Sequence, residues 1–274
     1  MGTVEARDGL GGEVGGAVGG FGALIIGDEI MRGKRRDVHF EKLREVFAQR
    51  GLKLDWVQFL GDDRALLIKT LQRTLADTDV VFSFGGIGAT PDDHTRQAAA
   101  AAAGVPLVLH PEAEALIRTR MAETNQEVTE GRLNMGVFPE GSRIVPNPYN
   151  RIPGFSYAHH HFFPGFPVMA HPMLEWCLET YYADLFNSLV EAEASIRVWE
   201  GIEGVMTPLM QEVETSYPGI KVFSLPFVGS AEIRRHVELG VRGDPAEVTP
   251  ALDRLKAGVS SLGYAWELLA TSPR

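Results

Sequence analysis

Glycines and acids follow one buried segment of this chain in an order that could bind a phosphate through a divalent cation. Residues 82–95 read Phe-Ser-Phe-Gly-Gly-Ile-Gly-Ala-Thr-Pro-Asp-Asp-His-Thr, between the apolar run 79–82 and an alanine-rich segment that ends at Gly104. This order predicts a strand, a glycine turn and a helix. The backbone N–H groups of such a turn can close on an anion at the start of the helix.

The acids at the helix start give the turn its expected chemistry. Asp92 and Asp93 would repel a phosphate that sits on Gly85, Gly86 and Gly88. A divalent cation that bridges carboxylate and phosphate oxygens satisfies both groups. The alternative is a plain strand-to-helix turn whose acids only cap the helix.

Composition limits the classes of protein to which the chain can belong. A length of 274 residues accommodates one sizeable domain and a smaller one. No stretch is long and apolar enough to span a bilayer, and we expect no secretory signal. The single cysteine, Cys177, fits a reducing compartment, so we expect a cytoplasmic protein with a buried thiol. The net charge of −10 argues against a nucleic-acid partner and for a metal beside any polyphosphate.

Strand and helix patterns alternate through the first two thirds of the chain. After a glycine-rich segment, which we expect to be a flexible leader, a buried strand begins at Phe21 and a helix begins at Asp37. The alternation predicts a mostly parallel sheet covered by helices on both faces, a three-layer α/β/α fold. Further strands are expected at 54–59, 79–82 and 107–109, and helices near 67–75, 92–104, 111–123 and 167–189.

Two regions depart from this alternation. Residues 131–163 carry many Pro and Gly residues and predict an irregular or antiparallel insertion. After residue 194, strands at 195–198, 220–225 and 233–241 and a helix at 246–262 predict a small α+β unit. The expected organisation is therefore a leader over 1–20, a main domain over 21–193 and a small domain over 194–274.

Four loops are expected at one edge of the sheet, because ligands of open parallel sheets bind beyond the carboxyl ends of the strands. Three of these loops bear acids, and each acid could alternatively be a solvated cap. The expected ligand-binding residues are Gly27, Asp28, Glu29, Gly85, Gly86, Gly88, Thr90, Thr95, Pro164 and Gly165, with Asp62, Asp92 and Asp93 as metal ligands.

These motifs together resemble a known family in order and spacing. They are Gly-Asp-Glu-Ile at 27–30 with Asp37, Gly-Asp-Asp at 61–63, the glycine loop at 85–95 and Pro-Gly-Phe-Pro at 164–167. The chain resembles the molybdopterin-binding (MoaB/Mog) domain, particularly the form found at the N-terminus of CinA, the competence/damage-inducible protein. The resemblance covers residues 21–186, and the tail is similar to the small α+β region that follows in CinA-like proteins.

The resemblance implies a homo-oligomer that binds molybdopterin or a nucleotide at these loops. In the Mog branch, adenylyl transfer to molybdopterin depends on Mg²⁺ and uses acids at the positions of Asp62 and Asp93, which are therefore the expected catalytic residues. In the CinA branch the comparable domain is associated with hydrolysis of a pyrophosphate such as that of ADP-ribose. We expect a CinA-like, Mg²⁺-dependent pyrophosphatase. The alternatives are a molybdopterin adenylyltransferase and a non-catalytic pterin- or nucleotide-binding protein.

Three positions depart from the family pattern. Ala89 stands where the glycine loop usually has Pro, His39 ends a first loop that usually ends in Asn, and Met169 stands where the fourth loop usually has Glu. The chain also lacks room for the deamidase domain of full-length CinA, so nicotinamide mononucleotide deamidation is not expected.

Two further features have alternative interpretations. On a strand, alternation would place His159 and His161 on the same face, toward a ligand or metal or on a surface or interface. The basic run 34–36 beside the first loop could pair with phosphate oxygens or be a solvated loop.

Overall fold

The structure is a computed structural model that describes residues 18–188 and 191–269. Most of the expected leader lies outside these described residues. Contacts divide the chain into two compact units, Met1–Ser188 and Leu189–Arg274, each of which is described by itself.

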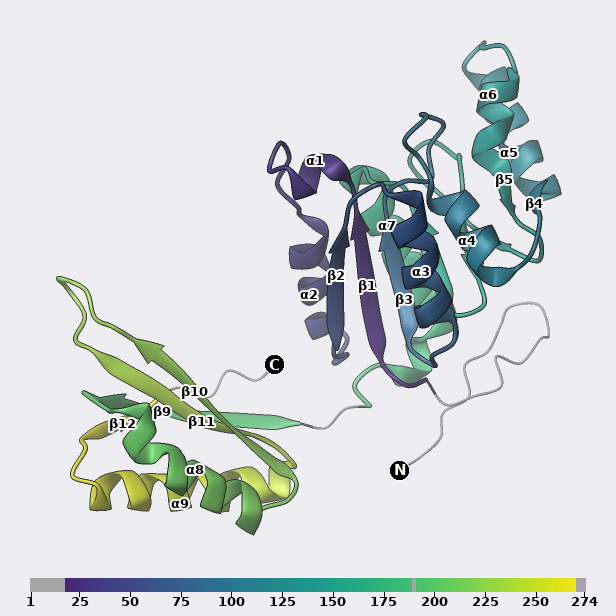
Figure 1. Ribbon diagram of the computed structural model, residues 1–274. Coiled ribbons are helices and arrows are strands. Elements are labelled where there is room, and N and C mark those ends of the chain that lie inside the picture. Colours follow the sequence, from purple (N-terminus) through teal and green to yellow (C-terminus); the bar gives the residue numbers. More distant parts are fainter. Residues whose placement is uncertain (1–17, 189–190, 270–274) are drawn as a thin grey trace. The chain divides into compact units, whose positions relative to one another are not determined.

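A six-stranded sheet in the order β2-β1-β3-β8-β7-β6 forms the centre of the first unit (Figure 1). The first four strands of this order run parallel, whereas β7 and β6 are antiparallel. A separate antiparallel pair joins β4 and β5. The strands are β1 (Phe21–Ile26), β2 (Trp56–Leu60), β3 (Val80–Phe84), β4 (Leu107–Leu109), β5 (Val137–Pro139), β6 (Arg143–Val145), β7 (Gly154–Tyr157) and β8 (His160–Phe163).

Helices cover both faces of this sheet, which confirms the predicted three-layer α/β/α architecture. All six residues of β1 are buried, because alternate side chains face a helical layer on either side. The layers are made by α2 and α7 on one face and by α3, α4 and α5 on the other. The helices are α1 (Asp28–Met31), α2 (His39–Gln49), α3 (Arg64–Leu75), α4 (Thr95–Ala103), α5 (Pro111–Glu123), α6 (Glu130–Leu133) and α7 (Pro167–Tyr181), with short 3₁₀ turns η1 (Asn134–Gly136) and η2 (Ala183–Leu185).

Local signals mark the start of α2 and the end of α4 where the sequence predicts. The expected starts and ends differ for two helices, because α4 begins at Thr95 rather than at Asp92 and α7 ends at Tyr181. The Asp37 carboxylate accepts hydrogen bonds from the N–H groups of His39 and Phe40 at the start of α2. Gly104 adopts the left-handed conformation, with φ of 71°, and ends α4. Cys177 on α7 is buried among apolar side chains, and this burial raises the pKa of its thiol well above the usual value.

The predicted insertion contains three antiparallel strands but differs from the prediction at its end. Strand β5 pairs antiparallel with β4, and β7 pairs antiparallel with both β6 and β8, as expected. The last strand, β8, instead lies parallel to β3 and belongs to the central sheet. The side chains of β8, from His160 to Phe163, are all buried. The backbone therefore passes through the core in β8, and the fourth loop begins directly after this strand.

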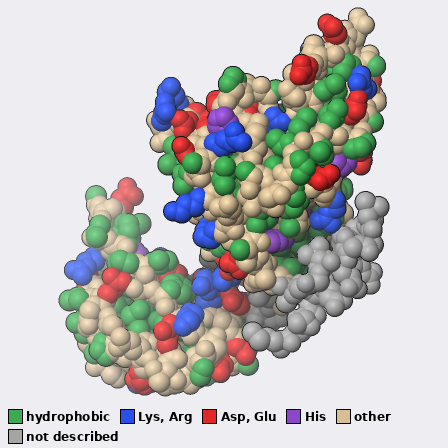
Figure 2. All heavy atoms as spheres, turned by 45° about the vertical axis from the view of Figure 1, so that its right-hand side comes forward, with side chains coloured by type: hydrophobic (Ala, Val, Ile, Leu, Met, Phe, Trp, Pro, Cys, Tyr) green, Lys and Arg blue, Asp and Glu red, His purple; other side chains and the backbone are tan. Residues whose placement is uncertain are grey.

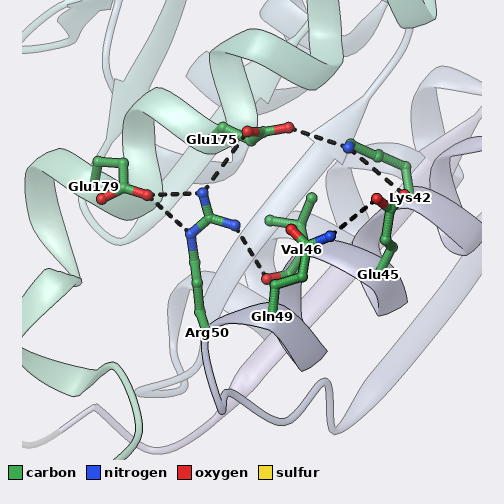
Figure 3. Close-up of polar contacts among 7 residues, drawn as sticks. All are labelled: Lys42, Glu45, Val46, Gln49, Arg50, Glu175 and Glu179. Atoms are coloured by element: carbon green, nitrogen blue, oxygen red, sulfur yellow. Dashed lines mark hydrogen bonds and ion pairs between the residues drawn. The ribbon is translucent and has the colours of Figure 1, made fainter.

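Ion pairs join α2 and α7, the two helices on one face of the sheet (Figure 3). The Arg50 guanidinium lies 2.7 Å from a Glu179 oxygen and 3.7 Å from a Glu175 oxygen. Lys42 reaches the same Glu175 at 3.2 Å. Exposed pairs of this kind contribute modestly one by one. The network nevertheless holds α7, and with it the fourth loop, against α2.

The three consecutive histidines are buried or half-buried residues of the core rather than a metal-binding row. The His160 ring lies 2.8 Å from the Thr74 hydroxyl, and the His159 ring lies 3.2 Å from the Thr74 carbonyl oxygen. The His161 ring lies between the hydroxyl groups of Ser156, at 2.6 Å, and Tyr182, at 2.7 Å. The expectation that His159 and His161 share a face is therefore wrong, because the strand begins at His160 and His159 lies in the preceding turn.

The second unit is a four-stranded antiparallel sheet with two helices on one face (Figure 1). This βαββαβ arrangement, with strands in the order β10-β11-β9-β12, confirms the predicted α+β unit. Two elements were not predicted from the sequence: α8, which has Pro208 in its interior, and the short strand β12. The elements are β9 (Ala192–Trp199), α8 (Glu203–Ser216), β10 (Ile220–Phe227), β11 (His236–Gly243), α9 (Pro245–Ser261) and β12 (Trp266–Leu268).

Among the described residues, no helix is both long and apolar enough to cross a membrane.

We expect His161 to make the first unit sensitive to acid. Burial lowers the pKa of His161 from 6.5 to about 3, so the unfolded chain takes up a proton that the folded chain refuses. The stability that depends on neutral His161 is complete above pH 6.5 and declines as the pH falls toward 3. At pH 5 the loss is about 2 kcal/mol from this residue alone.

The change to make is His161→Gln, followed by urea unfolding at pH 7 and pH 5. Hydrogen exchange in peptides from β3 and β8 reports the transition of this sheet. The variant should be less stable at pH 7 but lose about 2 kcal/mol less than the wild type between the two pH values. Equal losses in both proteins would contradict the prediction.

Candidate functional site

The four loops singled out in the sequence meet at one end of the six-stranded sheet. The Gly27 N–H donates to the Leu60 carbonyl at 3.0 Å and joins the first loop to the second strand. The Gly85 N–H donates to the Phe163 carbonyl at 3.0 Å and joins the glycine loop to the end of β8. Figure 2 shows acidic and basic side chains gathered at the end of this unit where α1 lies.

Two glycines allow the glycine loop to turn tightly against its neighbours. Gly85 and Gly86 have φ of 102° and 69°, values that side chains disfavour. A Cβ atom on Gly85 would also lie 2.2 Å from the Ile26 carbonyl oxygen at the end of β1. Thr95 is fully buried, and its hydroxyl donates to the Gly85 carbonyl at 3.0 Å, so Thr95 fixes the turn from behind.

The backbone of the glycine loop presents a row of free donors. The N–H groups of residues 86–89 donate no hydrogen bond to any described part of the chain. Consecutive unpaired N–H groups beside positive-φ residues form a concave anion-binding surface. This loop therefore has the backbone chemistry of a phosphate site.

The predicted polar residues of the loop bind to one another. The Asp93 carboxylate accepts hydrogen bonds from the Thr90 N–H at 2.8 Å and from the Thr90 hydroxyl at 2.5 Å, through the same oxygen, Oδ2. The Asp93 N–H donates back to the Thr90 carbonyl at 3.0 Å. These bonds close the turn that follows the free N–H groups, and Asp92 beside it is exposed.

A second pair of acids connects the first and second loops. The Asp28 N–H donates to the Asp62 carboxylate at 2.8 Å, and the Asp62 N–H donates to the Asp28 carboxylate at 3.3 Å. Partial burial raises the pKa of Asp62, and the negative charges of Asp28, Glu29 and Asp92 raise it further, whereas the hydrogen bond from the Asp28 N–H lowers it. Asp62 therefore takes up a proton more readily than a fully solvated aspartate does. The adjacent Asp63 caps α3 by accepting from the Leu66 N–H at 2.7 Å.

The carboxylates at these loops could hold a hard divalent cation such as Mg²⁺ only if a bound phosphate supplied further oxygens. Carboxylate oxygens suit Mg²⁺, which commonly takes one or two carboxylates and completes its shell with phosphate oxygens and water. Among the described residues, no group of three or more His, Cys, Asp or Glu side chains is arranged to hold a metal ion. A cation at Asp62, Asp92 or Asp93 would therefore need the oxygens of a bound phosphate.

Arg96 supports the glycine loop and was missed in the sequence. Its guanidinium is buried and donates to the carbonyl oxygens of Gly88, at 2.6 Å, of Val137, at 3.3 Å, and of Asn134. These bonds join the glycine loop to the segment before β5. A lone Arg is usually exposed, so the residue type gives no hint of this role. The one signal in the sequence is that Arg96 directly follows Thr95 at the start of the expected helix.

His39 is a second residue whose position the sequence did not reveal. Its ring stacks on Phe84, with centroids 4.7 Å apart, and its Nε2 lies 3.2 Å from the Gly165 carbonyl oxygen. Burial lowers its pKa, and burial lowers the pKa of the neighbouring His171 to about 4. Neutral His39 therefore links the last residue of β3 to the fourth loop.

The chain matches a known family over most of its first unit. The family model described as "Probable molybdopterin binding domain" matches residues 22–183. The chain belongs to this molybdopterin-binding-domain family, and the relatives that it matches are named CinA-like, which confirms the resemblance seen in the sequence.

Two curated relatives and one solved structure illustrate this membership. A "CinA-like protein" of Sulfurihydrogenibium sp. (strain YO3AOP1) is 33% identical over 132 residues, which are 48% of this chain and 33% of the relative. A "CinA-like protein" of Desulforapulum autotrophicum is 30% identical over 208 residues, 72% of this chain and 49% of the relative. The chain thus spans less than half the length of these two relatives. The structure of CinA from Thermoplasma acidophilum, whose function is described as unknown, matches 58% of this chain and 97% of its own with a TM-score of 0.52 and 23% identity, and shows the fold alone.

We expect Arg96→Met to loosen the glycine loop, because it removes the buried charged donor that three carbonyl oxygens share. The free energy of unfolding should fall by about 3 kcal/mol. Hydrogen exchange of the Gly85 and Thr95 N–H groups, which donate to the Phe163 and Gly86 carbonyl oxygens, should accelerate. The matched control is Arg118→Met, which removes an exposed pair with Glu114 and should cost less than about 1 kcal/mol. Equal, small losses in both variants would show that Arg96 does not support the loop.

Proposed function

We propose that this chain is a Mg²⁺-dependent pyrophosphatase that acts on ADP-ribose-like dinucleotides. The observation that carries the proposal is the row of unpaired N–H groups at residues 86–89, in the loop that also bears Asp92 and Asp93. The negative charge of Asp92 acts on the Asp62 carboxylate of the second loop. The row suits a phosphate, and the carboxylates suit a cation that offsets the phosphate charge.

Each group has a defined part in the proposed reaction. The N–H groups of the glycine loop hold the pyrophosphate and stabilise the charge that develops on its oxygens. Asp62, whose pKa is raised, orients a water molecule and accepts its proton as the water oxygen attacks phosphorus. The bond between that phosphorus and the bridging oxygen breaks, and ADP-ribose gives AMP and ribose 5-phosphate. When bound, Mg²⁺ would supply charge neutralisation between the phosphate oxygens and the carboxylates of Asp62 and Asp93, with Asp92 as a further ligand.

The family supplies two alternative functions for the same residues. A molybdopterin adenylyltransferase would place ATP on the glycine loop and release inorganic pyrophosphate. A carrier or sensor would bind a pterin or nucleotide without turnover. His39 and Met169, at positions where the family pattern differs, are the reason to test this second alternative.

We expect Asp62→Asn and Asp93→Asn to lower turnover at least a hundredfold while the protein stays folded. The amide oxygen at position 93 can still accept from Thr90, so the turn can close without the negative charge. The assay offers ADP-ribose, FAD, NAD and ATP with Mg²⁺, Mn²⁺ or Co²⁺ and measures release of AMP and phosphate.

The control is Asp63→Asn, the same chemical change on the adjacent residue. An Asn at this position can still cap α3, so turnover should stay near the wild-type level. Wild-type turnover in Asp93→Asn would contradict the catalytic assignment. Tight binding without products would indicate a carrier or sensor, and pyrophosphate release from ATP and molybdopterin would indicate the transferase.

A further inference from the structure

An exposed aromatic ring stands beside the glycine loop. Phe166 is 56% exposed, directly after Gly165 and at the start of α7. A Cβ atom on Gly165 would lie only 3.5 Å from the Cα of Gly85. Phe166 therefore directly follows the residue that lies against the glycine loop, whose N–H groups at residues 86–89 are free.

A cation from another loop fixes one side of this ring. The Arg35 guanidinium carbon lies 5.9 Å from the centroid of the Phe166 ring. The same guanidinium lies 3.6 Å from a Glu29 carboxylate oxygen on α1. Phe166 is thereby held between its own helix and the first loop, and its exposure shows that part of the ring is uncovered.

Exposed apolar side chains and cations lie on the two segments that Phe166 and Arg35 connect. Val168, on the first turn of α7, is 53% exposed, and Met31, at the end of α1, is 55% exposed. Lys34 and Arg36 flank Arg35 and make no ion pair within the described chain. A flat ring with attached phosphates has the matching chemistry, because the ring can stack while the phosphates meet positive charge and free N–H groups.

We infer that Phe166, braced by Arg35, is the surface on which the ring of a nucleotide- or pterin-type ligand stacks while its phosphates lie on residues 86–89. This inference rests on the proposed phosphate site and adds a residue that selects for ligands with an aromatic ring. Stacking of a base on an aromatic side chain is worth about 1–3 kcal/mol, which corresponds to roughly a 5- to 150-fold gain in affinity.

The experiment compares two probes, inorganic pyrophosphate and ADP, by calorimetry in Mg²⁺. Both carry the pyrophosphate group, but only ADP carries the ring. In the wild type, ADP should bind at least tenfold more tightly than pyrophosphate. In Phe166→Leu this preference should largely disappear while the affinity for pyrophosphate is unchanged, and Phe166→Trp should restore it.

Phe40→Leu is the matched control. Phe40 is also exposed, and the Arg44 guanidinium carbon lies 5.9 Å from its ring centroid, so the change removes the same type of contact. Because Phe40 lies on α2 rather than on the fourth loop, the preference for ADP should persist in this variant.

The two proposals can fail separately. If the wild type does not bind pyrophosphate, the phosphate site and the proposed function fail together. If it binds pyrophosphate but Phe166→Leu keeps the preference for ADP, the stacking role alone is overturned. A lower oligomeric state of Phe166→Leu in sedimentation, with the preference retained, would assign the ring to an interface between copies of the chain.

Discussion

The close approach of the glycine loop to the end of β1 is the constraint on which the site depends. Gly85 adopts a φ of 102° against the Ile26 carbonyl oxygen, where a side chain has no room. This turn brings β3 into α4 and leaves the following N–H groups without partners in the described chain. Thr95 and Arg96 at the start of α4 then hold the turn from behind through the Gly85 and Gly88 carbonyl oxygens. These two hydrogen bonds brace the turn on the side of α4.

Electrostatics explains why the same site collects acids. Asp28 and Asp62 exchange backbone hydrogen bonds across two loops, which holds two carboxylates close together. Their mutual repulsion contributes to the raised pKa of Asp62. A divalent cation would relieve this repulsion and attract the phosphate that the N–H groups can hold. In the proposed function, the acids would hold the cation and the glycine loop would hold the phosphate.

The rest of the first unit serves to bring the fourth loop to this arrangement. Strand β8 runs beside β3, and its buried histidines form hydrogen bonds with Thr74, Ser156 and Tyr182. Both ring nitrogens of His161 have a partner, whereas His160 is bonded through Nε2 alone. The chain then enters α7, which the ion pairs of Arg50 and Lys42 hold against α2. Phe166 and the Gly165 carbonyl reach the site through this support.

The sequence by itself determined the features that depend on neighbouring residues. The strand, glycine turn and acids of residues 82–95, the Asp37 cap and the Gly104 stop are local signals, and the alternation of strands and helices was enough to predict the layers. Helix α8 was not predicted, because Pro208 interrupts its pattern. A strand before Pro164 was expected, but its parallel pairing with β3 was not, because the pairing partner lies far away in the sequence.

Tertiary structure decided which distant side chains complete the site. The His39 ring contacts the Gly165 carbonyl oxygen, although 126 positions separate the two residues. The Arg96 guanidinium likewise donates to the carbonyl oxygen of Val137. Arg35 meets Phe166 in the same way. No periodicity encodes such pairs, since each depends on where separate loops arrive at the edge of the sheet.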